Sequence, residues 1–162
     1  MVLSLQFGAE RMVFALVCFV GEYERQMDDR NRFILPAKIR DKLSGTIYIT
    51  KAPVEKCLNL YTEAEWEVIA QKFSSLPTGT DTNVGNLQRK IFGNAIDCDL
   101  DKQGRVSLSK ALLDYAGITK DIVLVGANTK LEIWDAQAWA RVNADIDDSI
   151  VIEGIREYNI NI

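Results

Sequence analysis

The motif with the clearest chemistry is an Asp followed four residues later by an Arg, and the chain carries it twice. It occurs as Asp28-Asp-Arg-Asn-Arg32 and again, 73 positions later, as Asp101-Lys-Gln-Gly-Arg105. Asp accepts hydrogen bonds from the backbone that follows it, and Asn31 and Gly104 tolerate the positive φ of a tight turn. A turn of this kind holds a guanidinium beside a carboxylate that orients it. In the purely structural interpretation, each motif is a β-turn with a local ion pair and no ligand.

The likeness extends beyond the two turns. Leu58-Asn-Leu-Tyr61 returns as Leu131-Glu-Ile-Trp134, and Trp66 returns as Trp139, all at the same shift. Such self-similarity predicts two copies of one structural unit. We therefore expect a single α+β domain, mainly β, in which the two copies are interlocked around a pseudo-twofold axis. Strands from 20–35 are expected to pair with strands from 94–108 in one barrel.

Each copy is predicted to run strand, turn, strand, short helix, strand, strand, longer helix. The expected strands are 20–27, 32–35, 46–51, 57–61, 94–100, 105–108, 121–125 and 130–134. The expected helices are 36–43, one after the capping box Thr62–Glu65, one capped by Asp81 or Thr82, 110–116 between Ser109 and Gly117, and one through Trp139. The acidic stretch beyond Val142 is expected to be a solvated face or a frayed tail.

This order divides the chain into five segments. They are an N-terminal extension (1–20), a first repeat (21–76), a linker and helix (77–92), a second repeat (93–142) and an acidic C-terminal tail (143–162). The apolar run Met12–Val20 is too short to span a bilayer, which takes about 20 residues. We expect no membrane contact, and we interpret 1–20 as a non-globular extension or the product of an upstream start codon, with its end entering the first strand.

The composition excludes most catalytic classes. None of the 162 residues is His, so His-dependent triads and His-containing zinc sites are excluded. The cysteines Cys18, Cys57 and Cys98 are widely spaced, which favours reduced thiols in a cytosol. The chain also lacks a Gly-rich phosphate loop and a marked nucleophile. We therefore expect no enzyme, metal site, cofactor or small-molecule substrate.

The charge is distributed unevenly along the chain. The net charge is −4, yet residues 132–162 hold seven acids against two arginines. The first 131 residues therefore carry +1, and any basic face must be local.

Several stretches together resemble the bacterial MraZ family over about residues 21–142. They are Gly21-Glu-Tyr-Glu24, Asp28 to Arg32 before Phe33-Ile-Leu-Pro-Ala-Lys38, Asp99-Leu-Asp-Lys-Gln-Gly-Arg105, Ile122-Val-Leu-Val-Gly126 and Leu131-Glu-Ile-Trp134. The resemblance implies a tandem-repeat, AbrB-like swapped-hairpin barrel with peripheral helices. This sequence departs from the family pattern at Asn31, where a turn Gly is usual, at Ser109, where Pro is usual, and in the extension 1–20.

The resemblance also implies a function. It is that of a cytoplasmic, nucleoid-associated transcriptional regulator of the division and cell-wall gene cluster, which binds tandem repeats in promoter DNA as a ring. Arginine makes the commonest specific base contact, so Arg32 and Arg105 are expected to read base edges, while Arg30 and Lys102 from the same turns are expected to bind DNA beside them. The turns themselves are expected to be set by Asp28, Asn31, Asp101 and Gly104. Self-association is expected through surfaces outside the turns, involving the long helices after each β unit.

A second interpretation belongs to another functional class. The acidic C-terminal stretch, the 48% apolar content and the three Trp residues also fit a protein-interaction or antitoxin-like scaffold module without specific DNA readout. Salt separates the two, because DNA binding through Lys and Arg weakens steeply as salt rises, whereas an apolar protein interface does not.

Overall fold

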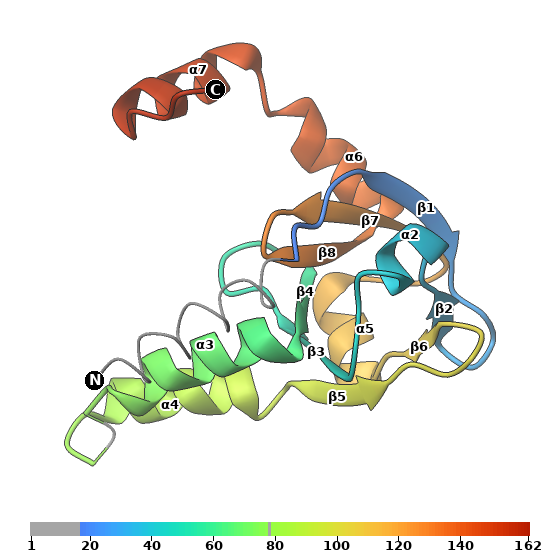
Figure 1. The fold of residues 1–162 in the computed structure, drawn as a ribbon, viewed down its shortest axis with the longest axis horizontal. Coiled ribbons are helices and arrows are strands. Elements are labelled where there is room, and N and C mark those ends of the chain that lie inside the picture. Colours follow the sequence, from blue (N-terminus) through green and yellow to red (C-terminus); the bar gives the residue numbers. More distant parts are fainter. Residues whose placement is uncertain (1–16, 78) are drawn as a thin grey trace, which may run out of the picture.

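The described part of the computed structural model, residues 17–77 and 79–162, contains eight strands and six helices (Figure 1). The strands are β1 (Glu22–Gln26), β2 (Arg32–Ile34), β3 (Thr46–Lys51), β4 (Leu58–Thr62), β5 (Ile96–Asp99), β6 (Arg105–Ser107), β7 (Asp121–Ala127) and β8 (Lys130–Asp135). The helices are α2 (Ala37–Arg40), α3 (Glu63–Ser74), α4 (Thr82–Phe92), α5 (Lys110–Ala116), α6 (Ala136–Ala144) and α7 (Asp148–Glu157). This mixture, with an antiparallel sheet, confirms the expected α+β class.

Six of the strands form one antiparallel sheet in the order β1-β7-β8-β4-β3-β5. The repeat relates β1 to β5 and β4 to β8 at the shift of the two Asp-x-x-x-Arg motifs, and it relates β3 to β7 at a shift two residues longer. The order is therefore symmetric about the central β8–β4 pair. Asn59 on β4 faces Glu132 on β8, which is its own equivalent in the second copy.

The remaining two strands come from different copies and pair with each other. β2 runs antiparallel to β6, with Arg32 opposite Ser107, Phe33 opposite Val106 and Ile34 opposite Arg105. The expected pairing of 20–35 with 94–108 is thus confirmed for this ribbon. It is wrong for the outer strands, since β1 pairs with β7 and β5 pairs with β3. The first strand of each copy therefore pairs with a strand of the other copy, and β1 and β5 form the two opposite edges of the sheet.

The main core lies between the sheet, the β2–β6 ribbon and the short helices. Phe33 and Val106 point into it from the ribbon, and Ile39 of α2 and Leu112 of α5 are fully buried beside them. Burying an aliphatic or aromatic side chain of this size contributes about 1.5–3 kcal/mol. The ribbon is therefore fixed by packing as well as by its own hydrogen bonds.

Two aromatic clusters attach the longer helices to the sheet. Trp66 of α3 stacks on Tyr48 of β3 with centroids 5.1 Å apart, and Trp139 of α6 packs 5.5 Å from Trp134 of β8. The expected caps are present, because Thr62 accepts from the Glu65 amide and Ser109 from the Leu112 amide. Helices α3 and α4 lie side by side and project from one side of the sheet (Figure 1).

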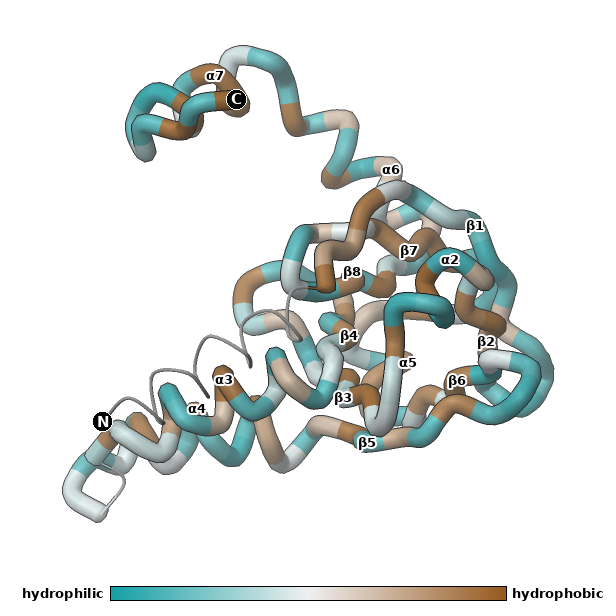
Figure 2. Tube along the Cα trace, viewed as in Figure 1, coloured by the Kyte–Doolittle hydropathy of each residue, from teal (hydrophilic) through white to brown (hydrophobic). Residues whose placement is uncertain are grey.

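The C-terminal stretch is a helix rather than a frayed tail. Asp147 accepts a hydrogen bond from the Ile150 amide at 3.0 Å and so caps α7. No residue of α7 is buried, so its acidic side chains do form a solvated face. Figure 2 shows that hydrophobic positions of α7 alternate with hydrophilic ones.

Most of the proposed extension 1–20 lies outside the described residues. At its end, Phe19 is buried in the core and forms a β-bridge with Asn128. No helix among the described residues is long and apolar enough to cross a membrane.

The exchange of strands predicts that neither half folds alone. A fragment ending in the linker at Gly79 would keep β3 and β4 but would lose the partners of β1 and β2. We expect this fragment to be unfolded or self-associated, and an equimolar mixture with the complementary fragment to regain the full-length circular dichroism spectrum. A monomeric first fragment with a cooperative thermal transition would contradict this prediction.

Candidate functional site

The first Asp-x-x-x-Arg motif is a tight turn organised by one carboxylate. The Oδ1 atom of Asp28 accepts hydrogen bonds from the amides of Arg30 and Arg32, both at 2.9 Å. Its Oδ2 atom accepts from Nε of Arg32 at 2.9 Å. One side chain therefore closes the turn and also fixes the guanidinium that follows it.

The second motif repeats this network atom for atom. Oδ1 of Asp101 accepts from the amides of Gln103 at 2.9 Å and Arg105 at 3.0 Å, and Oδ2 accepts from Nε of Arg105 at 2.7 Å. Lys102 is exposed at the tip of this turn, as Arg30 is at the tip of the first. Two copies of one cation-presenting turn are thus present in the chain.

Positive φ angles occur at the same place in both turns. Asn31 has a φ of 58° and Gly104 a φ of 70°. Gly104 is further constrained because a Cβ atom there would overlap the Arg40 side chain, which packs against the turn. The first turn accepts Asn, whereas the second leaves no room for it without a shift of Arg40.

The β2–β6 ribbon brings the two motif arginines together. Directly opposite residues of an antiparallel pair point to the same face, so Phe33 and Val106 point inward while Arg32 and Arg105 point outward. Arg32 and Arg105 are diagonal neighbours in this register, a relation that separates backbone positions by about 7–8 Å. Both turns lie next to each other at the right of Figure 1, away from α3, α4 and α7.

The turns also exchange backbone hydrogen bonds with the opposite copy. The amide of Leu108 donates to the Asn31 carbonyl, and the amide of Leu35 donates to the Gly104 carbonyl, each at 2.9 Å. Neither turn can therefore move without the strand of the other copy. The result is one rigid surface made from two halves of the sequence.

The guanidinium groups keep free donors on this surface. Within the described residues, the terminal nitrogens of Arg32 and Arg105 make no hydrogen bond, since each pairs with its Asp through Nε alone. The two side chains are 26% and 35% exposed. Each can therefore offer two terminal nitrogens to one ligand.

Hydrogen bonding sets the titration of the two turn carboxylates. For Asp101, the amide of Arg105 and then its guanidinium hold the pKa below its ordinary value. For Asp28, desolvation is the largest single influence and raises the pKa, but the hydrogen bonds from Arg32 and Arg30 together outweigh it and lower the pKa. Both carboxylates are therefore ionised at neutral pH, as an ion pair with arginine requires.

Sequence reasoning missed two arginines that brace this surface. Nε of Arg25 on β1 donates to the Ile34 carbonyl at 3.1 Å and so ties β1 to β2. Arg40 packs on Gly104, and its Nε atom is buried without a partner among the described residues. The Arg25 contact joins β1 to β2, and no local sequence pattern indicates that these two strands lie together. For Arg40 the signal is its departure from the repeat, because Leu113 stands at the equivalent position.

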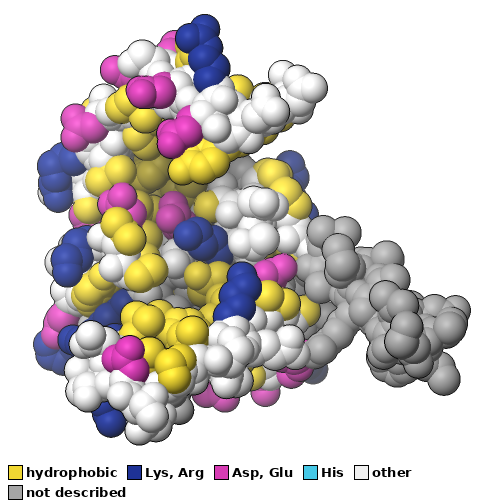
Figure 3. All heavy atoms as spheres, turned by 90° about the vertical axis from the view of Figure 1, so that its left-hand side faces the viewer, with side chains coloured by type: hydrophobic (Ala, Val, Ile, Leu, Met, Phe, Trp, Pro, Cys, Tyr) yellow, Lys and Arg dark blue, Asp and Glu magenta, His cyan; other side chains and the backbone are white. Residues whose placement is uncertain are grey.

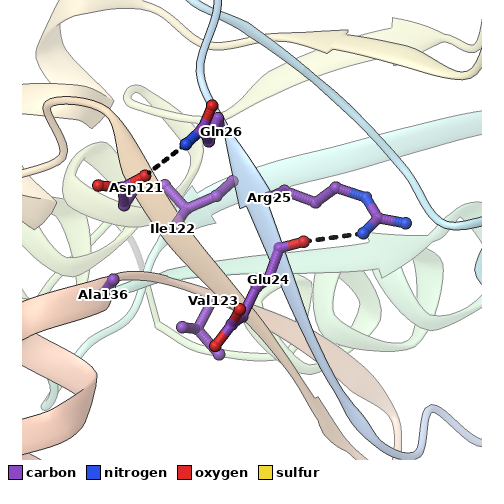
Figure 4. A pocket seen from close by; sticks show the side chains of 7 residues that line it. All are labelled: Glu24, Arg25, Gln26, Asp121, Ile122, Val123 and Ala136. Carbon is purple, nitrogen blue, oxygen red and sulfur yellow. Dashed lines mark hydrogen bonds between the residues drawn. The ribbon is translucent and has the colours of Figure 1, made fainter.

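A hollow of about 510 Å³ at the edge of the sheet does not resemble an active site. It lies between β1 and β7 near the start of α6, where Gln26 donates to Asp121 at 3.0 Å (Figure 4). In the same view the Arg25 guanidinium turns away and donates to the Glu24 carbonyl at 2.8 Å. The residues that line this hollow include no nucleophile next to a base, and neither Arg32 nor Arg105 is among them.

Cys57 and Cys98 carry no reactive thiolate. All three cysteines are free, and burial raises the pKa of Cys57 to about 12 and that of Cys98 to about 11. These two thiols are protonated at neutral pH and behave as small apolar side chains. Among the described residues no group of three or more His, Cys, Asp or Glu side chains is arranged to hold a metal ion.

Comparison with known proteins gives one consistent match. The family model described as "MraZ protein, putative antitoxin-like" matches residues 18–86 and 91–151. A protein of Clostridium acetobutylicum is 36% identical over 143 residues, which cover 88% of this chain and 99% of that protein. One of Clostridium botulinum is 38% identical with the same coverage, and one of Limosilactobacillus fermentum is 40% identical over 75% of this chain and 84% of that protein. All three are named "Transcriptional regulator MraZ", which confirms the resemblance drawn from the sequence.

The lowered pKa values predict how the turns respond to acid. A carboxylate whose folded pKa is depressed stabilises the fold above its unfolded pKa, and this contribution is lost as pH falls through the folded pKa. Between about pH 5 and pH 3, the melting temperature of Asp101→Asn should therefore fall less than that of the wild type. Asp28→Asn, the equivalent change in the other turn, should behave alike, and the double variant should show the flattest profile. Parallel profiles for all four proteins would show that the carboxylates do not hold the turns.

Proposed function

Because the chain belongs to the MraZ family, we propose that it is a sequence-specific DNA-binding transcriptional regulator that reads DNA with its two Asp-x-x-x-Arg turns. The observation that carries this proposal is the placement of Arg32 and Arg105 on one outward face of the β2–β6 ribbon. The two arginines come from different copies, yet they form one small cationic surface.

The ribbon suits the major groove in size and chemistry. That groove is about 12 Å wide and admits a two-stranded β-ribbon. A guanidinium reads guanine by donating to O6 and N7 at once, which needs two adjacent N–H donors. Because Asp28 and Asp101 occupy only the Nε atoms, the terminal nitrogens of both arginines remain available for such a contact.

Arg30 and Lys102 have a different role in this proposal. Both are exposed at the tips of their turns, which lie at opposite ends of the ribbon, and there they would meet phosphates rather than base edges. The first turn carries two acids and two arginines, and the second carries one acid and two cations. Attraction to DNA by one copy of the chain is therefore weak.

Weak contacts of this kind require several copies acting together. Linked sites raise the overall affinity without any new contact per copy. The proposal therefore includes a homo-oligomeric ring that engages tandem promoter repeats upstream of division and cell-wall genes, at the nucleoid in the cytoplasm. These finer features rest on the resemblance of the sequence to the family.

Replacing the motif arginines should remove sequence discrimination. A good bidentate contact is worth about 1–3 kcal/mol against the wrong base. Arg32→Ala and Arg105→Ala should each reduce the preference for the promoter repeats of the protein's own operon over scrambled DNA by about 5- to 150-fold, from that energy range. Gel-shift titration of both DNA sequences measures this ratio.

Arg141→Ala is a matched control, because this arginine lies on α6, away from the turns. It should leave the ratio unchanged. Full affinity and full specificity in both motif variants would show that the turns are structural only. The protein-interaction or antitoxin-like scaffold role would then be the better account.

Lys102→Ala should affect all DNA sequences alike. A lysine that neutralises a phosphate releases counterions, so its loss weakens specific and random binding together and lowers the salt slope by about 1 per bound chain. Titrations at several salt concentrations on both DNA sequences would measure the slope. A loss confined to the promoter repeats would instead assign Lys102 to base readout.

A further inference from the structure

Helix α7 presents apolar side chains to solvent. None of its ten residues is buried, and Ile150, Val151 and Ile152 are 57%, 48% and 47% exposed. A helix of this length is marginal in water unless tertiary packing supports it. It stands away from the sheet in Figure 1, so the surface that supports it must come from elsewhere.

One stripe of α7 combines the exposed Ile150 side chain with negative charge. Ile150, Glu153 and Glu157 are three and four residues apart in turn, so they share one stripe of the helix. Over residues 145–162 the chain has five acids and a single Arg. Figure 3 shows acidic and hydrophobic side chains together on this upper arm of the molecule. A surface that receives this stripe must therefore offer an apolar contact to Ile150 and positive charge to the two carboxylates.

A groove elsewhere on the chain has this character. It encloses about 420 Å³ between the β3–β4 loop, α4 and α5. Leu87, which is 44% exposed, and Tyr115 line its apolar part. The Tyr115 hydroxyl donates to the Ala52 carbonyl at 2.6 Å, which fixes the ring in the floor.

Three lysines surround this groove. The Nζ atoms of Lys51 and Lys56 lie 5.1 Å and 4.4 Å from the Tyr115 ring centroid, and Lys90 approaches from α4. Within the part of the chain that the structure describes, none of the three forms an ion pair. Glu55 in the same loop offsets only one of these charges. The groove therefore keeps an excess of positive charge that an acidic ligand would neutralise.

We propose that this groove receives α7 of a second copy of the chain. The stripe of Ile150, Glu153 and Glu157 would place the apolar side chain against Leu87 and Tyr115 and the carboxylates near the lysines. The lengths agree as well, since α7 has ten residues and α4 has eleven. The two partners use different surfaces, so the contact is head-to-tail and generates a ring or an open chain of copies. The inference deepens the self-association in the proposed function and rests on it.

Charge reversal on the full-length chain tests this contact. Sedimentation velocity at micromolar concentration should show assembled wild type and largely monomeric Lys56→Glu/Lys90→Glu. The control Lys72→Glu/Lys120→Glu changes two exposed lysines outside the groove by the same charge and should remain assembled. Glu153→Lys/Glu157→Lys, the reversal on α7, should also be monomeric. Far-UV circular dichroism and thermal melting verify that each variant is folded.

Mixing the two interface variants gives the decisive result. The groove variant keeps a natural α7, and the α7 variant keeps a natural groove, so an equimolar mixture should assemble although each variant alone does not. Variants that assemble like the wild type, or a mixture that stays monomeric, would overturn the proposed contact. A wild type that is monomeric at every concentration would overturn it together with the self-association. DNA specificity dependent on Arg32, measured separately, would then still uphold the readout by the turns.

Discussion

The pairing of β2 with β6 is the constraint on which the functional surface depends. This ribbon joins the two copies of the repeat through backbone hydrogen bonds, and the burial of Phe33 and Val106 holds it against the core. If each copy paired only with itself, the two Asp-x-x-x-Arg turns would be separate and free to differ in orientation. Because they share a ribbon, the position of Arg32 is fixed relative to Arg105 by strand geometry alone.

The turn carboxylates show a compromise between orientation and charge. Asp28 closes its turn and anchors Nε of Arg32, but it also cancels a positive charge that would attract DNA. An uncharged residue would leave a more basic surface with a mobile guanidinium. The ion pair therefore weakens the attraction to any polyanion but fixes the direction of the guanidinium donors. Fixed donors favour base readout over general phosphate binding.

Features encoded by neighbouring residues could be predicted from the sequence, and features encoded by distant ones could not. Asp28 and Thr62 act within a few residues, so the turn boundary and the helix cap can be predicted from local chemistry. The partner of β1 depends on how the two copies exchange strands. The residues of β1 do not indicate that it pairs with β7. The C-terminal acids indicate a solvated stretch, but they do not by themselves indicate the helix that Asp147 caps. The lysines around Tyr115 meet only through tertiary packing.

The energy available to one copy gives a reason for the proposed assembly and the proposed DNA readout to lie on different sides of the molecule. In the proposed readout, two bidentate arginine contacts would supply about 2–6 kcal/mol of discrimination, whereas specific regulators typically reach about 4–10 kcal/mol over random DNA. Under the proposed readout, a single copy therefore reaches at most the lower part of that range, and several linked copies would extend it. Contacts between copies must then leave both turns uncovered. The arrangement in Figure 1 meets this requirement, because α4 and α7 project away from the β2–β6 ribbon. In the proposed assembly, weak contact by each copy would be useful, since an isolated repeat would be released while a row of correctly spaced repeats would be retained.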